Sequence, residues 1–366
     1  MSREATSPVL AEAIRGAWSG PIIDCDVHAN VPSLETLFPY LDSVWVQFTR
    51  ERGYTGPLRL ASTYPPNLAS TCRPEWRPGD RRVPASELAL LQEHVLDPLQ
   101  VERAILTCYY ALDSLRHPDW AAAFVRALND WLVAEWLDKD PRLAASLVVP
   151  ARYPQDMVRE IERVGDHPGF VQVLMPVRSD RLYGNRIWHP VYEAMVRHNL
   201  VMGIHWGGTA EASPGPAGWP TWYVEEYAAE VQAYGAQVTS LIAEGVFKVF
   251  PELRVSILEI GFAWLPSWLF RMDKEWKGLR REIPWVTRPP SEIIREHMRF
   301  SVTPLDAGPI SDLANVIEWL GSDELLMFAT DYPHFHDDDL SVLLNATPQH
   351  MHAKLMSENA RAWYRL

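Results

Sequence analysis

Residues 21–28 read PIIDCDVH, an apolar run that ends in alternating acidic and imidazole side chains. In an extended strand every second side chain points to the same face, so Asp26 and His28 share one face and Cys25 points to the other. A carboxylate and an imidazole two residues apart are a ready pair of metal ligands. The segment therefore predicts a strand whose end carries a metal site.

Further apolar runs have the composition of buried strands, and segments with helical periodicity separate them. The predicted strands are 21–28, 101–109, 143–150, 170–177, 201–206, 254–260, 299–304 and 325–331. The predicted helices are 118–138, 154–165, 189–199, 223–247, 262–277, 309–320 and 346–364. This alternation favours parallel pairing through right-handed crossovers. It predicts an α/β fold, a closed (β/α)8 TIM barrel, because no glycine-rich dinucleotide turn follows the first strand.

In such a barrel the C-terminal ends of the strands carry the chemistry. The ionisable residues at or just after these ends are Asp26, His28, His205, Glu259, Asp331 and His334. Buried together they need a strong positive centre, because burial and mutual repulsion would otherwise raise the carboxylate pKa values. We therefore predict that these six bind a divalent metal, with Glu259, Asp331 and His205 catalytic. The alternative is a cluster held only by hydrogen bonds, and the sequence leaves open whether His334 and His336 face the site.

Five motifs occur along the chain: DCDVH at 24–28, GIHWGG at 203–208, EIGFAWLPSWLFRMD at 259–273, FATDYPH at 328–334 and ENARAWY at 358–364. In these motifs the chain resembles the amidohydrolase-related family. This is the branch of the amidohydrolase superfamily that contains the aminocarboxymuconate-semialdehyde decarboxylase type. The resemblance covers about residues 22–364 and implies that Asp26, His28, His205 and Asp331 hold a divalent metal.

Two positions depart from the pattern of that branch. Many of its decarboxylases have His-x-His or Glu-x-His in the first strand, where this chain has Asp26 and His28. They also tend to end the sixth strand in a histidine, where this chain has Glu259. A carboxylate there removes a group that titrates near neutrality and adds a hard oxygen ligand able to bridge metals. The mixed set is large enough for two ions and suits iron and manganese.

The leading hypothesis is a dinuclear iron or iron/manganese monooxygenase that hydroxylates a small organic substrate, as some superfamily members with similar motifs do. An external reductase and ferredoxin would supply electrons, because the chain has no loop for a nucleotide or flavin and only three cysteines. The alternative is one metal, such as zinc, in a hydrolase or non-oxidative decarboxylase, with Asp331 as base and Glu259 as proton shuttle. A third hypothesis is a catalytically silent subunit that shapes or stabilises a partner. The resemblance also implies that the enzyme forms a homo- or hetero-oligomer with a related subunit.

The chain is longer than an ordinary barrel of about 250 residues, so we expect one domain, 1–366, with insertions. Residues 30–87 are rich in Pro, Arg and aromatic side chains without sustained periodicity, which predicts an irregular excursion over the barrel mouth. Residues 206–223 predict a lid, with a packed surface loop as the alternative.

Four residues are candidates for substrate binding. Trp206, Trp219 and Trp222 in the predicted lid could wall the substrate off from water. Arg178 follows the fourth predicted strand and could bind a substrate carboxylate through two hydrogen bonds. A structural ion pair with Asp180 or another nearby acid is the alternative.

A net charge of −13 and a pI near 5.4 argue against a nucleic-acid partner, which would need a basic face. The N-terminus has no apolar core of a signal peptide, and no run approaches the length of a membrane span. The three cysteines are odd in number and widely spaced, as expected of reduced thiols. The composition predicts a cytoplasmic enzyme with a small-molecule substrate.

Overall fold

The computed structural model describes residues 10–56, 72–79, 82–110, 114–208, 213, 215, 217–306, 308–336 and 339–366. Eight parallel strands form one sheet in the order β1 to β8. They are β1 (Ile22–His28), β2 (Val101–Thr107), β3 (Leu143–Val148), β4 (Phe170–Arg178), β5 (Val201–Gly208), β6 (Val255–Ile257), β7 (Met298–Ser301) and β8 (Leu326–Met327). The sheet closes because Cys25 N–H donates to Phe328 O at 3.0 Å and His28 N–H donates to Tyr332 O at 2.7 Å. The predicted (β/α)8 barrel is confirmed.

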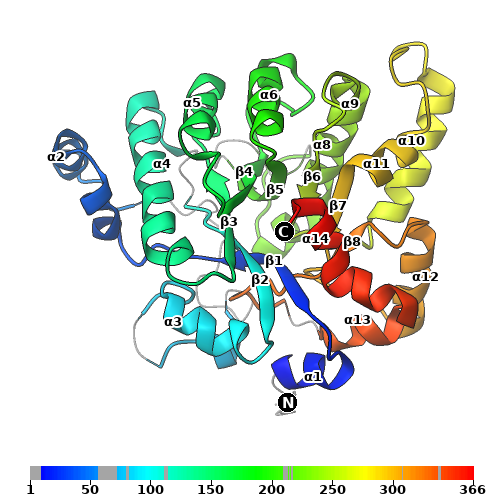
Figure 1. Cartoon of the computed structure of the whole chain (residues 1–366). Helices are drawn as coiled ribbons and strands as arrows, with labels where there is room; N and C mark the ends of the chain where they lie inside the picture. The colour runs from blue at the N-terminus through cyan, green and yellow to red at the C-terminus, as the bar shows by residue number, and fades with distance from the viewer. Residues whose placement is uncertain are drawn as a thin grey trace.

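Helices surround the strands in Figure 1. They are α1 (Leu10–Ala17), α2 (Ser43–Glu51), α3 (Leu88–Leu91), α4 (Pro118–Leu132), α5 (Pro154–Val164), α6 (His189–Arg197), α7 (Tyr223–Ala229), α8 (Val231–Ala243), α9 (Val246–Val249), α10 (Leu265–Leu279), α11 (Pro290–His297), α12 (Ile310–Leu320), α13 (Ser341–Ala346) and α14 (Asn359–Tyr364). The predicted helix 223–247 divides at Glu230, and it divides again at Gly245, whose φ of +73° favours glycine.

The first strand contains a β-bulge. Asp24 pairs with Ala104 and Val27 with Leu106, so β1 advances three residues while β2 advances two. Cys25 therefore packs in the cluster inside the barrel, together with Ile23. The prediction that Cys25 points away from the face of Asp26 and His28 is wrong, because the extra residue breaks the alternation of the strand.

The last helix, α14, fills one end of the barrel, in front of the strands in Figure 1. Trp363 and Tyr364 join an apolar cluster with inward-facing residues of the strands. Tyr364 OH donates to Gln172 Oε1 at 3.0 Å, and Trp363 Nε1 donates to Ser256 Oγ at 3.1 Å. Asn359 ties the helix to β8 through Leu326 O at 2.9 Å. This end corresponds to the N-terminal ends of the strands, and its core is filled by side chains of the chain itself.

The predicted insertion 30–87 is only partly as expected, and residues 57–71, 80 and 81 lie outside the described part. The 3-10 turn η1 (Leu34–Tyr40) and α2 form regular structure at the outer side of α4, where Trp120 Nε1 donates to Thr49 Oγ1 at 3.0 Å. A later part reaches the barrel mouth, because Arg73 N–H donates to Pro333 O at 2.9 Å in the loop after β8.

Candidate metal centre

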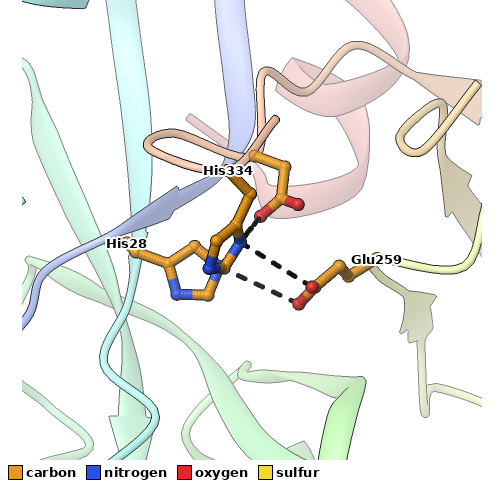
Figure 2. A group of neighbouring side chains, drawn as sticks. His28, Glu259 and His334 are labelled. Atoms are coloured by element: carbon orange, nitrogen blue, oxygen red, sulfur yellow. Dashed lines mark hydrogen bonds and ion pairs between the residues drawn. The ribbon is translucent and has the colours of Figure 1, made fainter. Parts of the chain in front are cut away.

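The predicted ligands meet at the C-terminal ends of four strands. Asp26 and His28 belong to β1 and His205 to β5, whereas Glu259 follows β6 and Asp331 follows β8. All five are buried, with at most 6% of their surface exposed. His334 comes from the loop after β8, and its ring centroid lies 4.4 Å from that of His28. Figure 2 shows His28 and His334 beside the carboxylate of Glu259.

Two overlapping sets of donor atoms can be distinguished among the described residues. One set is His28, Glu259, Asp331 and His334, and the other is Asp26, His28 and His205; within each set the donor atoms lie within 4.8 Å of one another. His28 belongs to both. Glu259 Oε2 also lies 3.0 Å from His205 Nε2 and 3.9 Å from His28 Nε2, so this oxygen stands between the two sets.

Three atoms of the cluster are buried without a hydrogen-bond partner: Asp26 Oδ2, His205 Nε2 and Glu259 Oε2. They converge, since His205 Nε2 is 3.4 Å from Asp26 Oδ2 and 3.0 Å from Glu259 Oε2. Unpartnered buried polar atoms are strongly unfavourable. A divalent cation would satisfy all three, because mixed carboxylate and imidazole sets are ordinary ligands of such ions. The residues present therefore fit a metal.

The remaining atoms of these ligands are held by neighbours that orient them. Thr107 Oγ1 donates to Asp26 Oδ1 at 2.7 Å, which leaves Oδ2 for the centre. His205 Nδ1 lies 2.8 Å from Trp206 O, so an N–H at Nδ1 donates to this carbonyl and Nε2 faces the carboxylates. Glu259 N–H donates to Ser301 Oγ at 3.1 Å. Such contacts fix ring and carboxylate orientation before any ion binds.

Glu259 and Asp331 lie past the ends of β6 and β8, not within the strands as predicted. Each has φ of +54°, in the left-handed region that residues other than glycine rarely adopt. The backbone leaves the ladder at these points, so the regular strands end earlier than the predicted 254–260 and 325–331. Strained residues of this kind concentrate at functional sites when surrounding contacts hold them.

The carboxylate of Asp331 contacts three imidazoles. Oδ1 lies 2.9 Å from His28 Nε2 and 3.0 Å from His334 Nδ1, while Oδ2 lies 2.6 Å from His336 Nε2. His336 Nδ1 in turn is 3.2 Å from Tyr227 OH on α7. The question left open by the sequence is answered, because both His334 and His336 face the cluster. His336 contacts the second oxygen of Asp331, so it orients this ligand.

The charges of the metal-free cluster depend on one another. Burial favours the neutral form of Asp331, but the rings of His334, His28 and His336 hold its pKa well below its usual range. Burial lowers the pKa of His334, but Asp331 and Glu259 raise it by more, so that it lies at about 9. Burial would also lower the pKa of His205, yet Asp26 and Glu259 raise it well above its ordinary value. Without a metal, the imidazoles carry the positive charge that the carboxylates need.

The predicted substrate residues are placed differently from one another. Arg178 is buried, with NH2 at 3.0 Å from Glu226 Oε1 and Nε at 3.2 Å from Glu230 Oε1, and its guanidinium lies over the Trp206 ring. This geometry favours the alternative of a structural ion pair, although the partner is not Asp180. Burial raises the pKa of Glu230 to about 7, although Arg178 opposes the shift.

The two remaining lid tryptophans lie at the surface. Trp219 is 63% and Trp222 is 69% exposed, so the structure does not bring them into the centre. The sequence places both tryptophans in a loop just before a helix, and this position alone does not tell whether their rings face the barrel or the solvent. Residues 209–212, 214 and 216 of the predicted lid lie outside the described part. Trp206, in contrast, is half-buried and its ring contacts Tyr227 at 6.4 Å between centroids.

Tyr227 and Asp24 were missed by the sequence-based prediction. Tyr227 is 109 residues from its partner His336, and nothing in its helical register separates it from other buried aromatic residues. Asp24 is fully buried and hydrogen-bonded to Thr330 beside Asp331. An available signal for Asp24 was its position, because an acidic residue within an apolar strand needs a partner.

A closed parallel barrel with buried carboxylates and imidazoles at its C-terminal mouth defines a metal-dependent enzyme of the TIM-barrel type. The chain belongs to the amidohydrolase family, because residues 23–366 match the model of the family described as Amidohydrolase. Among curated protein sequences no match was found. Within the described residues, no helix has the length and apolar character needed to cross a bilayer.

Solved structures with the same fold include two decarboxylases. One is 5-carboxyvanillate decarboxylase from Novosphingobium aromaticivorans with manganese and 4-hydroxy-3-methoxy-5-nitrobenzoic acid (16% identity, TM-score 0.69, 94% of this chain and 96% of that chain). Another is a dihydroxybenzoic acid decarboxylase from Polaromonas sp. JS666 with manganese and 2-nitroresorcinol (18% identity, TM-score 0.66, 95% of this chain and 98% of that chain). An amidohydrolase from Mycobacterium avium subsp. paratuberculosis also matches (20% identity, TM-score 0.70, 95% of this chain and 100% of that chain). At these identities the likeness establishes the fold.

Proposed function

We propose that this chain is a metal-dependent, non-oxidative decarboxylase of a small, hydroxylated aromatic carboxylate. The observation that carries the proposal is that Asp26 Oδ2 and His205 Nε2, which are buried and have no hydrogen bond, lie 3.4 Å apart at the barrel mouth with Glu259 Oε2 beside them. Two solved decarboxylases of this fold hold manganese and a phenolic compound, which supports the choice of reaction. This proposal replaces the leading hypothesis from the sequence with its alternative.

In decarboxylation a carboxylate carbon leaves as CO2 and the ring carbon takes up one proton. A bound divalent ion would supply positive charge that orients the substrate and stabilises charge developing on it. Asp26, His28, His205 and Asp331 would hold this ion. Asp331 is suited to stay ionised, because three imidazoles contact it.

Glu259 is the residue that we assign to proton transfer. Its Oε1 lies 3.7 Å from His334 Nδ1, and the low pKa of Asp331 makes that residue a poor acid. The imidazole of His334 is part of a hydrogen-bonded chain to Asp331 and can return a proton to Glu259 after each turnover. The burial of Glu259, 4% exposed, limits exchange with bulk water during the step.

A second candidate function is favoured by the number of donors. The cluster offers two sets that share His28, with Glu259 between them, which is more than one ion requires. A carboxylate able to bridge two ions suits an iron or iron/manganese pair. That centre would support hydroxylation of the substrate by O2, with electrons from an external reductase and ferredoxin. The partner proteins and an oligomeric assembly stay proposals.

The two candidates are separated by metal content and by the need for oxygen. We would load the protein with manganese, iron or zinc, measure metal per chain by inductively coupled plasma mass spectrometry, and incubate it with a panel of hydroxybenzoates. CO2 release under argon, with about one metal per chain, is expected. Two equivalents of iron, with product formed only in the presence of O2 and a reductant, would overturn the decarboxylase proposal.

Glu259→Ala adds an internal test of the same question. In a one-ion centre, the metal should stay while decarboxylation falls, because Glu259 transfers the proton. In a two-ion centre, about one equivalent of metal should be lost, because the bridging carboxylate is gone. Ser267→Ala, at an exposed position on α10, is a control that should change neither quantity.

A further inference from the structure

The side chain of Asp24 is a buried carboxylate that does not belong to either donor set. It is fully buried on β1, two residues before Asp26. Its Oδ1 accepts from Thr330 N–H at 2.9 Å, and its Oδ2 accepts from Thr330 Oγ1 at 2.6 Å. Asp26 N–H also points at Oδ1, at 3.4 Å. One carboxylate thus contacts the backbone immediately before Asp331 and the backbone of Asp26.

These contacts bridge the seam where the barrel closes. Between β1 and the segment after β8, Asp331 N–H donates to Asp26 O at 3.0 Å. Thr330 Oγ1, which donates to Asp24, also accepts from Tyr332 N–H at 3.2 Å. The peptide groups on both sides of Asp331 are therefore tied, directly or through Thr330, to β1.

Asp331 needs this support because its backbone is in the left-handed region, with φ of +54°. A residue other than glycine in that region is disfavoured by about 1 kcal/mol or more and keeps its conformation only when its surroundings impose it. The conformation directs the carboxylate towards His28 and His334.

We infer that Asp24 is a positioning residue that sets the distance between the ligands Asp26 and Asp331 through its hydrogen bonds to Thr330. The inference rests on the metal centre of the proposed function, but not on which reaction the centre performs. All groups facing Asp24 in these bonds are donors, so an acceptor-only carboxylate suits the position. An asparagine would turn an NH2 group towards one of those donors.

The test uses Asp24→Asn and Thr330→Val, with Thr330→Ser as the conservative variant that keeps the hydroxyl. Each metal-free protein would be titrated with Mn²⁺, and Co²⁺ complexes would be compared by visible absorption, which reports ligand geometry. Loss of contacts that orient metal ligands typically weakens affinity about 10–100-fold. We expect a loss in this range for Asp24→Asn and Thr330→Val with an altered Co²⁺ spectrum, and near wild-type values for Thr330→Ser.

A matched control separates positioning from a general loss of stability. Asn129 is equally buried and holds backbone atoms of Val148 through bonds of 2.9 and 3.0 Å, and neither residue belongs to a donor set. Asn129→Ala should lower the melting temperature of the metal-free protein without changing Mn²⁺ affinity or the Co²⁺ spectrum. If Asp24→Asn does not fold, the inference is tested by comparing the Mn²⁺ affinity and Co²⁺ spectrum of Thr330→Val with those of Thr330→Ser.

Each result has one meaning. Wild-type affinity and spectrum in Thr330→Val and in any folded Asp24→Asn would overturn the inference. The same follows if Asn129→Ala weakens Mn²⁺ binding as much as they do, since the effect would then be structural. Failure of the wild-type protein to bind any divalent ion would instead overturn the proposed metal centre.

Discussion

The two ends of the barrel are formed by the same eight strands, but one end is covered by an apolar helix and the other is lined by ionisable side chains. At the N-terminal end, α14 covers an apolar cluster, and the polar groups of Gln172, Ser256, Trp363 and Tyr364 are hydrogen-bonded to one another. At the C-terminal end, ionisable side chains converge, and three of their buried atoms are close to one another without forming a hydrogen bond. The first end is completed by side chains of the chain itself, whereas the second presents two sets of donor atoms that could hold a metal ion.

This contrast separates residues that stabilise the fold from residues that bind, a division expected in barrels. A variant at the N-terminal end should change the free energy of unfolding and leave metal affinity alone. A variant at the C-terminal end should change metal affinity.

The largest expected effect is on stability at the covered end. Trp363→Ala removes a buried ring that bonds Ser256 and stacks under the Arg299 guanidinium at 4.3 Å. Truncation of a buried tryptophan typically lowers the free energy of unfolding by about 3–5 kcal/mol. Urea denaturation of the metal-free protein measures it. Trp363→Phe keeps an aromatic ring but loses the hydrogen bond and part of the buried volume, so it should lose less, roughly 1–3 kcal/mol. A matching loss of Mn²⁺ affinity in Trp363→Ala would contradict the separation.

The next effect is on metal binding at the open end. Loss of groups that only orient metal ligands typically costs about 10–100-fold in metal affinity, so loss of a ligand itself in Asp331→Asn should weaken binding by about 100-fold or more. Metal content after gel filtration, and a competition titration, measure this. Asp180→Asn removes a carboxylate that pairs with Arg152 and is 53% exposed, so it serves as control with unchanged metal content. Full metal retention in Asp331→Asn would show that this residue is not a ligand.

A third prediction concerns pH. The pKa of His334 is raised from 6.5 to about 9 in the metal-free protein, so its charged form stabilises the fold below pH 6.5, and this contribution is lost as the pH rises through about 9. In the proposed centre His205 is a ligand. Burial would lower its pKa, yet Asp26 and Glu259 raise it well above its ordinary value, so a bound ion must displace a proton from this ring. Apparent Mn²⁺ affinity should therefore rise about tenfold per pH unit between pH 7 and 9 for each proton released.

Two measurements check the pH dependence. Competition titrations at pH 7, 8 and 9 give the slope, and proton release into weakly buffered solution gives the number of protons directly. His198→Ala, which removes a histidine bonded to Glu162 and Asp166 away from the barrel mouth, should leave the slope unchanged. A flat profile in the wild-type protein would mean that no imidazole of the cluster must lose a proton on binding.

The smallest effect is expected for the exposed tryptophans. Trp219→Ala and Trp222→Ala should change the free energy of unfolding by no more than about 0.5 kcal/mol, because both rings are largely exposed. Mn²⁺ affinity should also stay the same. A loss above 1 kcal/mol in either variant, measured by urea denaturation, would mean that these side chains are covered in solution.

The fold and the ligand cluster could be predicted because both depend on local order in the sequence. Apolar runs alternate with helical periodicity, and an ionisable residue ends an apolar run at Asp26, His205 and Glu259. The rule that strand ends meet at one mouth then brings them together. The family match over residues 23–366 agrees with the resemblance carried by these motifs.

The rest depends on contacts that no local pattern records. The partners of Arg178 are Glu226 and Glu230, on and beside a helix 48 residues or more away. The direction in which Trp222 points depends on the path of a loop. Regular strands were predicted to include Glu259 and Asp331, but hydrogen bonds from these segments to neighbouring strands hold both in a left-handed conformation.

The bulge in β1 lets one strand serve two purposes. Because one extra residue is absorbed between Asp24 and Val27, the strand places Cys25 in the inner core and still directs Asp26 and His28 to the mouth. In a strand without a bulge, residues with odd numbers and residues with even numbers would lie on opposite faces. Here the barrel core and the candidate metal centre both take side chains from the same seven residues.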